Sequence, residues 1–162
     1  MHDSKIKVIY VDMDGVLCNF NKLYVEMFNV SPSQTDKKDF GTNFKQLIEA
    51  DGFAKLEPMP DFWSLIAHLN CFSIPKEILS STARKEHHEE ISRQKKLWLN
   101  TRGINYKQNF VPGKHLKAQY ATPDSILIDD TIDVIDAWEK AGGIGILHKN
   151  AFSTIAILSM HV

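Results

Sequence analysis

The sequence predicts one α/β domain built on a mostly parallel β-sheet with helices on both faces. Short apolar segments of strand type alternate with longer segments of helical periodicity along most of the 162 residues. Three of the apolar segments end in polar or acidic side chains, which a purely structural sheet does not need. The chain is 43% hydrophobic, which suits a single globular domain with a sizeable core.

The most informative stretch lies near the N-terminus. The apolar run Ile6–Val11 reads as a buried strand, and it is followed at once by Asp12, Asp14 and Gly15. Two carboxylates held close together repel each other unless a cation or a proton lies between them. Aspartate and glycine are also ordinary turn formers, so this motif alone leaves a structural and a functional interpretation open.

The segment after this motif reads as a small helical insert. From Asn19 apolar residues recur at helical spacing, at Phe20, Leu23, Tyr24, Met27 and Phe28. Ser31-Pro32-Ser33 should break that helix, and residues 36–43 read as polar and irregular. A second short helix is expected around Phe44–Ile48. The two prolines of Leu56–Pro60 require an extended or turning segment, after which Asp61 is expected to cap a helix.

Further strands and helices alternate in the second half. Ile78 and Leu79 read as a strand that ends in hydroxyl side chains, and Phe110–Val111 as a brief strand. Between them, Lys85–Thr101 is a highly charged helix, expected to turn Ile91, Leu97 and Trp98 inward and to leave His87 and His88 on a solvated face. Ser125–Ile128 and Ile144–Leu147 read as the last strands, with a helix between them and another at the C-terminus.

The carboxyl ends of these strands are expected to form a shared site. Right-handed crossovers bring the carboxyl ends of parallel strands to one edge of the sheet, where such folds bind ligands. That edge would collect acids, hydroxyls and a lysine that are far apart in sequence: Asp12, Asp14, Ser80, Ser81, Lys114 or Lys117, Asp129 and Asp130.

Phosphoryl transfer through a covalent aspartate fits this set of side chains. A carboxylate can attack phosphorus, but it needs a cation to offset its repulsion from the phosphate. Oxygen ligands favour a hard ion such as Mg²⁺. A hydroxyl and a lysine could hold the phosphate oxygens, and Asp14 could protonate the leaving oxygen and later deprotonate water.

Several motifs resemble known families. DMDGVL, the strand ILSS, a following lysine and ILIDD together resemble the haloacid dehalogenase superfamily. DMDGVLCNF, GFAKLEPMP, ILSSTAR, LIDD and AGGIGILH resemble the 5'(3')-deoxyribonucleotidase family more specifically. The similarity extends from about Val8 to Leu147 and is poor between Asn29 and Ala50. It implies a Rossmann-like core of residues 1–18 and 61–162 and a small helical cap of residues 19–60 that excludes water from the intermediate.

The resemblance also implies roles for individual residues. Asp12 would be the nucleophile and Asp14 the general acid and base. Magnesium would be held by Asp12, the backbone carbonyl of Asp14 and Asp130, while Asp129 would support the metal or orient the lysine. The remaining matches are Ser80 and Ser81 at the phosphate, Arg84 near it, Lys117 in preference to Lys114 as the catalytic lysine, and Phe20 with Phe53 facing the nucleoside.

Some of the residues matched to the family's site could instead have a purely structural role. Arg84 also fits a solvated helix start, and Phe20 and Phe53 also fit core packing. The sequence departs from the nucleotidases at Asn19, where close relatives often have an acid, and at Thr131, where arginine is common. These departures leave the chemistry intact but put the base and sugar preference in doubt.

Other functional classes remain open. One is a phosphatase of the same superfamily that acts on sugar phosphates or polynucleotide ends, and another is an inactive nucleotide binder. A receiver domain also combines aspartates with a lysine, but its phosphorylated aspartate lies on a later strand and it has no cap.

Composition limits the partners. The formal net charge of -1 gives no basic field for a stable nucleic-acid complex. The two cysteines, Cys18 and Cys71, do not form a metal-binding or disulfide pattern. With no signal-peptide pattern and no apolar run of about 20 residues, we expect a cytoplasmic monomer or homodimer.

Overall fold

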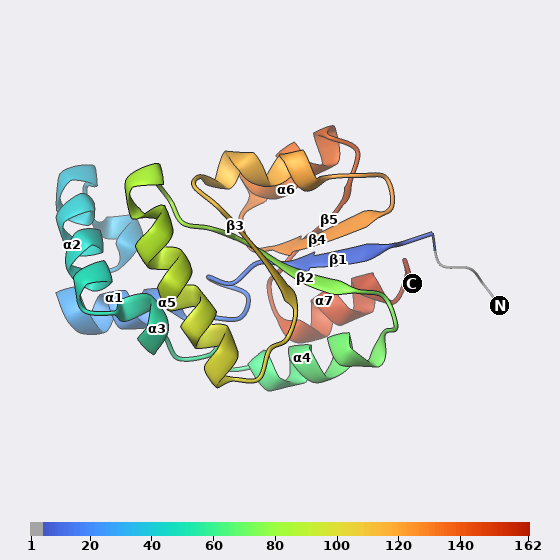
Figure 1. The fold of residues 1–162 in the computed structure, drawn as a ribbon, viewed down its shortest axis with the longest axis horizontal. Coiled ribbons are helices and arrows are strands. Elements are labelled where there is room, and N and C mark those ends of the chain that lie inside the picture. The colour runs from blue at the N-terminus through green and yellow to red at the C-terminus, as the bar shows by residue number, and fades with distance from the viewer. Residues whose placement is uncertain (1–4) are drawn as a thin grey trace.

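The computed structural model describes residues 5–162 and contains a five-stranded parallel sheet (Figure 1). Its strands are β1 (Val8–Val11), β2 (Lys76–Ser81), β3 (Lys107–Val111), β4 (Ser125–Asp129) and β5 (Ile144–Leu147), in the order β3-β2-β1-β4-β5. All four pairings are parallel, which confirms the predicted sheet. Residues 1–4, the first part of the predicted core, lie outside the described residues.

Strand alternation divides the core between the two faces of the sheet. Ile9, Val11 and Ile78 pack into one apolar cluster, while Tyr10 and Leu79, their neighbours in sequence, pack into the other. Both faces are apolar because both are covered, as expected for a parallel sheet. The central position of β1, between β2 and β4, places its carboxyl end where the order of the strands reverses.

Helices cover the two faces unequally. α6 (Ile132–Lys140) and the 3-10 helix η3 (Lys114–Tyr120) lie on the face of Tyr10. α4 (Phe62–Cys71), α5 (His88–Thr101) and α7 (Ala151–Leu158) lie on the other, and the 3-10 helix η2 (Lys85–His87) precedes α5. The predicted assignment of Leu97 to the inward side of α5 is wrong, because this side chain is 46% exposed.

The segment between β1 and α4 lies beyond the carboxyl edge of the sheet (Figure 1). It contains α1 (Phe20–Phe28), the 3-10 helix η1 (Pro32–Gln34), α2 (Lys37–Glu49) and α3 (Gly52–Lys55). Its two ends pair with each other, since the Asn19 amide donates to the Glu57 carbonyl and the Met59 amide to the Leu17 carbonyl, both at 2.8 Å. α5 holds it from the side, because Gln94 accepts from the Phe53 amide at 2.9 Å.

Two local predictions need correction. The region expected to be irregular, residues 36–43, forms the first half of α2, because the Asp36 carboxylate accepts from the Asp39 amide at 2.8 Å and caps the helix. Asp61, in contrast, makes no side-chain cap on α4. Its carboxylate accepts from the Ala151 amide at 2.5 Å and so ties the start of α7 to the start of α4.

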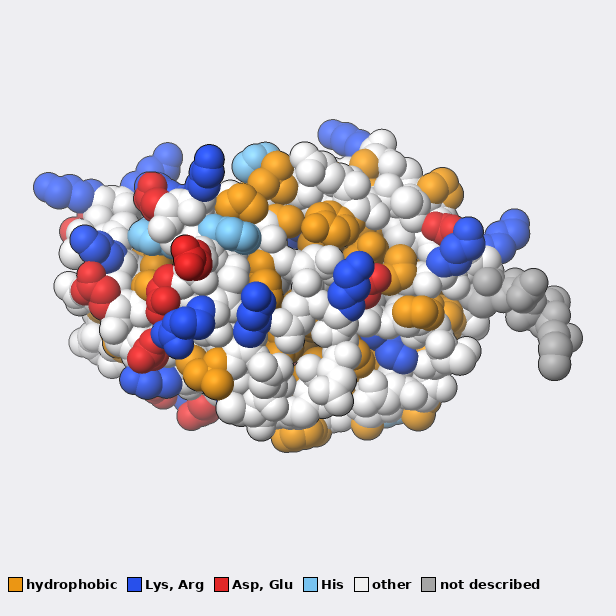
Figure 2. Space-filling model, viewed as in Figure 1, with side chains coloured by type: hydrophobic (Ala, Val, Ile, Leu, Met, Phe, Trp, Pro, Cys, Tyr) orange, Lys and Arg blue, Asp and Glu red, His pale blue; other side chains and the backbone are white. Residues whose placement is uncertain are grey.

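No helix within residues 5–162 has both the length and the apolar character needed to span a bilayer. On the face drawn in Figure 2, acidic and basic side chains are intermixed over the segment of α1–α3 and over α5, so this face carries no continuous basic surface.

Candidate active site

The loop that follows β1 is fixed by its own backbone. The Met13 carbonyl accepts from the amides of Val16, Leu17 and Cys18, and this compact turn carries Asp12 and Asp14 beside the end of β4. Gly15 has φ of +82°, which disfavours other residues. A Cβ at this position would lie 1.9 Å from Oδ2 of Asp130, so the absence of a side chain lets Asp130 approach the loop.

Lys117 joins the ends of β1 and β4. Its side chain is only 3% exposed, and Nζ donates to Asp12 Oδ1 at 2.9 Å and to Asp129 Oδ2 at 2.7 Å. Burial disfavours the charged lysine, but the two carboxylates outweigh burial and raise its pKa. Lys117 therefore remains a cation between the two strand ends. Lys114, the alternative lysine, is exposed at the cavity.

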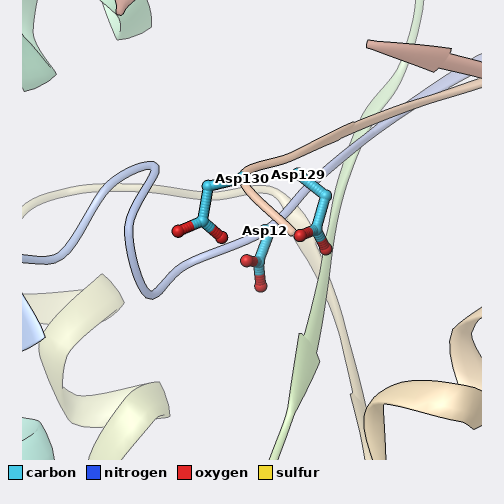
Figure 3. Close-up of side chains that lie close together, drawn as sticks. All are labelled: Asp12, Asp129 and Asp130. Atoms are coloured by element: carbon cyan, nitrogen blue, oxygen red, sulfur yellow. The ribbon is translucent and has the colours of Figure 1, made fainter. Parts of the chain in front are cut away.

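Three carboxylates meet at this point (Figure 3). Asp12, Asp129 and Asp130 each offer an oxygen, and these oxygens lie within 4.8 Å of one another. Burial and the charge of Asp12 raise the pKa of Asp129 to about 7, although Lys117 opposes the shift. Desolvation and the same charge raise the pKa of Asp130 to about 6. The cluster thus holds more negative charge than Lys117 balances, and oxygen donors of this kind suit a hard divalent cation.

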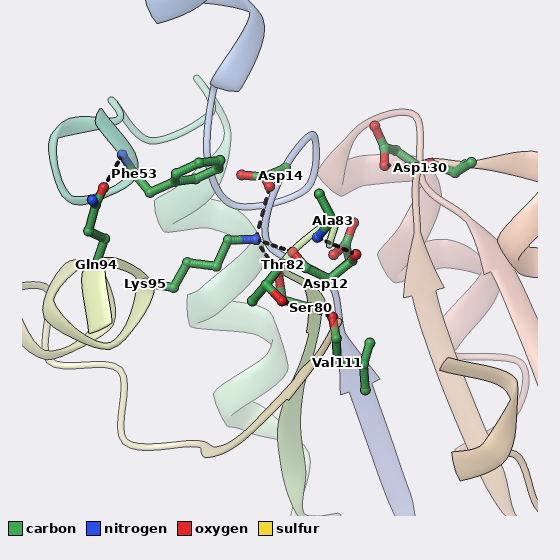
Figure 4. A network of polar contacts seen from close by, with 12 residues as sticks. Asp12, Asp14, Phe53, Ser80, Thr82, Ala83, Gln94, Lys95, Val111 and Asp130 are labelled. Atoms are coloured by element: carbon green, nitrogen blue, oxygen red, sulfur yellow. Dashed lines mark hydrogen bonds and ion pairs between the residues drawn. The ribbon is translucent and has the colours of Figure 1, made fainter. Parts of the chain in front are cut away.

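A second buried lysine, which the sequence analysis missed, holds Asp14 (Figure 4). Lys95 on α5 is 1% exposed, and its Nζ donates to Asp14 Oδ2 at 3.0 Å, to Ser80 Oγ at 2.7 Å and to the Ser81 carbonyl at 2.8 Å. It also lies 5.3 Å from the centre of the Phe53 ring. The signal was present in the spacing, since Lys95 lies between Ile91 and Trp98 on the buried stripe of the helix.

The hydroxyls at the end of β2 differ in their surroundings. Ser80 is fully buried and accepts from Lys95, and it is not among the described residues that line the cavity. Ser81 does line the cavity. Thr82, which also borders it, donates to the Val111 carbonyl at 3.2 Å and contacts His88 Nδ1 at 2.8 Å. These contacts favour Ser81 over Ser80 as the hydroxyl nearest to a ligand.

A cavity of about 620 Å³ lies between the acidic cluster and the helices α1–α3. Asp12, Asp14 and Asp130 form its floor, and the Phe20, Phe44 and Phe53 rings line it, with centroids 5.8–6.4 Å apart. The predicted ligand residues Phe20 and Phe53 therefore both lie at the cavity, while Phe44 was expected only as a helix-packing residue. This volume suits a small-molecule ligand.

Arg84 and the two histidines of the sequence analysis lie at the margin of the cavity or outside it. The Arg84 side chain is 76% exposed, lies 3.7 Å from Glu86 and does not line the cavity. The histidines expected on a solvated face are instead half-buried, with the His87 ring packed edge-on against Phe44.

Comparisons with solved structures identify the fold. No family model matches the chain, and no curated protein sequence matches it significantly. A Thermotoga maritima protein described as a beta-phosphoglucomutase aligns over 97% of this chain and 100% of its own, with a TM-score of 0.59 and 14% identity. A haloacid dehalogenase-like hydrolase from Streptococcus pneumoniae aligns over 94% and 90%, with a TM-score of 0.53 and 12% identity. L-2-haloacid dehalogenase from Xanthobacter autotrophicus aligns over 86% and 76%, with a TM-score of 0.50 and 11% identity.

These alignments cover the sheet and most of the chain at low sequence identity. They agree with the superfamily resemblance in DMDGVL and ILIDD, and they do not single out the nucleotidases. The chain has the α/β fold of the haloacid dehalogenase-like hydrolases.

Proposed function

We propose that the protein is a magnesium-dependent phosphatase that hydrolyses nucleoside monophosphates, with a preference for deoxyribonucleotides, through an aspartyl-phosphate intermediate. The observation that carries this proposal is the position of Asp12. Its carboxylate lies at the carboxyl end of β1, paired with Lys117, clustered with Asp129 and Asp130, and open to the cavity.

In the first step an oxygen of Asp12 forms a bond to phosphorus. The bond from phosphorus to the leaving oxygen breaks, and its electron pair stays on that oxygen, which takes a proton from Asp14. In the second step water attacks the phosphorus, Asp14 accepts the proton of the water, and the bond to Asp12 breaks. The products are an alcohol and inorganic phosphate, and both aspartates return to their initial state. Lys117, which donates to Asp12 Oδ1, would hold a phosphate oxygen beside it.

The acidic cluster fits a magnesium ion. Asp12 and Asp130 would hold it with the backbone carbonyl of Asp14, as the family resemblance implies, and Asp129 would support it. When bound, the ion neutralises charge on the transferred phosphoryl group. The raised pKa values of Asp129 and Asp130 indicate carboxylates that a cation would satisfy in place of protons.

Magnesium affinity is therefore expected to rise with pH. Protons compete for Asp130 and Asp129, whose pKa values are about 6 and about 7, so the affinity should increase between pH 5 and pH 8 and then level off. Calorimetric titration at several pH values measures this dependence. Asp130→Ala should weaken binding more than Asp129→Ala, with Asp136→Ala, an exposed acid on α6, as the control. The reverse order would make Asp129 the direct ligand, and an affinity independent of pH would contradict the competition.

The aromatic lining supports a nucleotide as the substrate. Phe20 and Phe44, which are half-buried, offer apolar faces on which a base of any identity can stack, and the buried Phe53 ring lies behind Phe20. An apolar wall beside the sugar favours deoxyribose, because a 2'-hydroxyl buried there without a partner loses roughly 1–3 kcal/mol. We expect deoxyribonucleotides to be preferred over ribonucleotides by about tenfold to a hundredfold, since 1.4 kcal/mol corresponds to about tenfold.

Phe20→Ala is expected to separate nucleotides from simpler substrates. The variant should lose much more kcat/KM for dUMP and dGMP than for 4-nitrophenyl phosphate, which carries neither base nor sugar. Phe152→Ala, a substitution of an 86% exposed phenylalanine on α7, is the control and should leave both unchanged. Paired assays of dUMP, UMP, dGMP and GMP test the sugar preference at the same time. Equal ribo and deoxy rates, or equal losses for all substrates, would contradict the pocket model.

Phosphate release from a panel of phosphomonoesters with magnesium tests the function as a whole. Turnover of sugar phosphates or polynucleotide ends with no turnover of nucleotides would retain the chemistry and exclude the proposed substrate. A polynucleotide end is disfavoured by the net charge of -1 and by the mixed charges of the face in Figure 2. Binding of nucleotides without any release of phosphate would indicate an inactive binding protein.

A further inference from the structure

We propose that Lys95 is a positioning residue that fixes the orientation of the Asp14 carboxyl for its role as the catalytic acid. This inference deepens the proposed function and rests on it. The inference is based on the hydrogen bonds of Lys95. An ammonium group has three N–H donors and no acceptor, and Lys95 has three acceptors within 3.0 Å, namely Asp14 Oδ2, Ser80 Oγ and the Ser81 carbonyl.

The lysine has little freedom to move. Its side chain is 1% exposed, and the Phe53 ring covers it at 5.3 Å from the ring centre. The preceding residue of α5, Gln94, is also fully buried and accepts from the Phe53 amide. α5 therefore brings one rigid cation to the point where β2, the β1 loop and α3 meet (Figure 4).

The contact with Asp14 is asymmetric, and this has a chemical consequence. Oδ2 accepts a hydrogen bond from Lys95, whereas Oδ1 is buried and has no hydrogen-bond partner among residues 5–162. Figure 4 shows this second oxygen directed away from Lys95, on the Phe53 side, and both residues line the cavity. Because Lys95 cannot accept a proton, Oδ2 must act as an acceptor. Lys95 therefore fixes the orientation of the Asp14 carboxyl by holding one of its two oxygens, and this orientation decides how the acid meets a leaving oxygen in the cavity.

Lys95 thus plays a different part from Lys117. Lys117 pairs with the proposed nucleophile Asp12 and with Asp129, whereas Lys95 pairs with the proposed acid and with the end of β2. Ser80 fits the same interpretation. Its hydroxyl is fully buried against Lys95, so it holds the positioning lysine rather than a phosphate oxygen.

The test compares two substrates that differ mainly in the basicity of the leaving group. Phenolate is a stronger base than 4-nitrophenolate, so phenyl phosphate needs proton donation more than 4-nitrophenyl phosphate does. General acid catalysis contributes about 10²–10⁴-fold. Lys95→Met, which keeps the length of the side chain, is expected to lower kcat/KM about a hundredfold for phenyl phosphate and less than about tenfold for 4-nitrophenyl phosphate.

Two controls separate positioning from damage to the fold. Lys96→Met, at the exposed neighbouring lysine, should change neither rate. In an Asp14→Asn background, Lys95→Met should no longer alter the ratio between the two substrates, because the group through which it acts has been removed. Equal losses for both substrates in Lys95→Met, or an undiminished effect without Asp14, would overturn the proposal.

Ser80→Ala provides a second variant if Lys95→Met fails to fold. Loss of one anchor of Lys95 should give a smaller loss in the same direction, with phenyl phosphate more affected. A Ser80 that held phosphate would instead affect both substrates equally, and that result would also overturn the proposal. Failure of the proposed function has a different signature, since the wild-type protein would then release no phosphate from either substrate with magnesium present, and the role of Lys95 would fall with it.

Discussion

Replacing Asp12 with asparagine is expected to abolish phosphate release and to leave the fold intact. Asparagine has nearly the same shape, but its amide is a poor nucleophile, so kcat should fall by at least about a thousandfold. The fold should tolerate the change for an electrostatic reason. In the metal-free protein Lys117 faces both Asp12 and Asp129, and Asp12→Asn leaves Lys117 and Asp129 as a balanced pair.

Thermal unfolding of the metal-free protein should therefore give the variant a Tm equal to or above that of the wild type. The pKa of Asp129 should fall at the same time, because the charge of Asp12 helps to raise it. Asp136→Asn, which changes an exposed acid on α6, is the matched control and should retain full activity. Turnover by Asp12→Asn at the wild-type rate would contradict the covalent mechanism through Asp12.

Gly15→Ala is expected to disable the site and to lower stability through backbone strain. The added Cβ would lie 1.9 Å from Asp130 Oδ2, so the Asp130 carboxyl must leave its position beside the β1 loop. The backbone angle of +82° adds about 1–2 kcal/mol of strain. Because Asp130 is a proposed magnesium ligand, we expect both the magnesium affinity and kcat/KM at a fixed magnesium concentration to fall about a hundredfold. Losses of this size are typical when a group that orients a metal ligand is removed.

Gly103→Ala separates the clash from the strain. Gly103 also has a positive φ, +69°, but a Cβ there would meet no atom within 4 Å. It should therefore lose a similar amount of stability and no activity. A fall in magnesium affinity of the same size in both variants would contradict the role assigned to Gly15.

The sequence predicted the sheet and its polar edge because local rules determine them. β1 and β4 are apolar runs that end in acids, and the parallel topology brings those ends together. Residues 36–43 were misjudged as irregular because their polarity outweighed the Asp36 cap in the interpretation. The cap at Asp61 was wrong for a non-local reason, since its partner, Ala151, lies 90 residues away.

Lys95 illustrates what the sequence did not reveal. It lies in the run RQKK of a charged helix, where a lysine normally faces solvent, and its three acceptors come from two segments distant in sequence. Only its spacing from Ile91 and Trp98 indicated burial. Leu97, expected inward for its hydrophobicity, lies on the exposed side instead. Helical phase was therefore a better guide than residue type.

Chemical trapping of the intermediate tests the central claim most directly. The wild-type protein is mixed with magnesium and 4-nitrophenyl phosphate, quenched during turnover and reduced with borohydride, which converts an aspartyl phosphate to homoserine. Peptide mass analysis then locates the modified residue. The proposed mechanism predicts homoserine at position 12 and at no other aspartate, and none in Asp12→Asn. Phosphate release without trapped homoserine, or homoserine at position 14, 129 or 130, would contradict it.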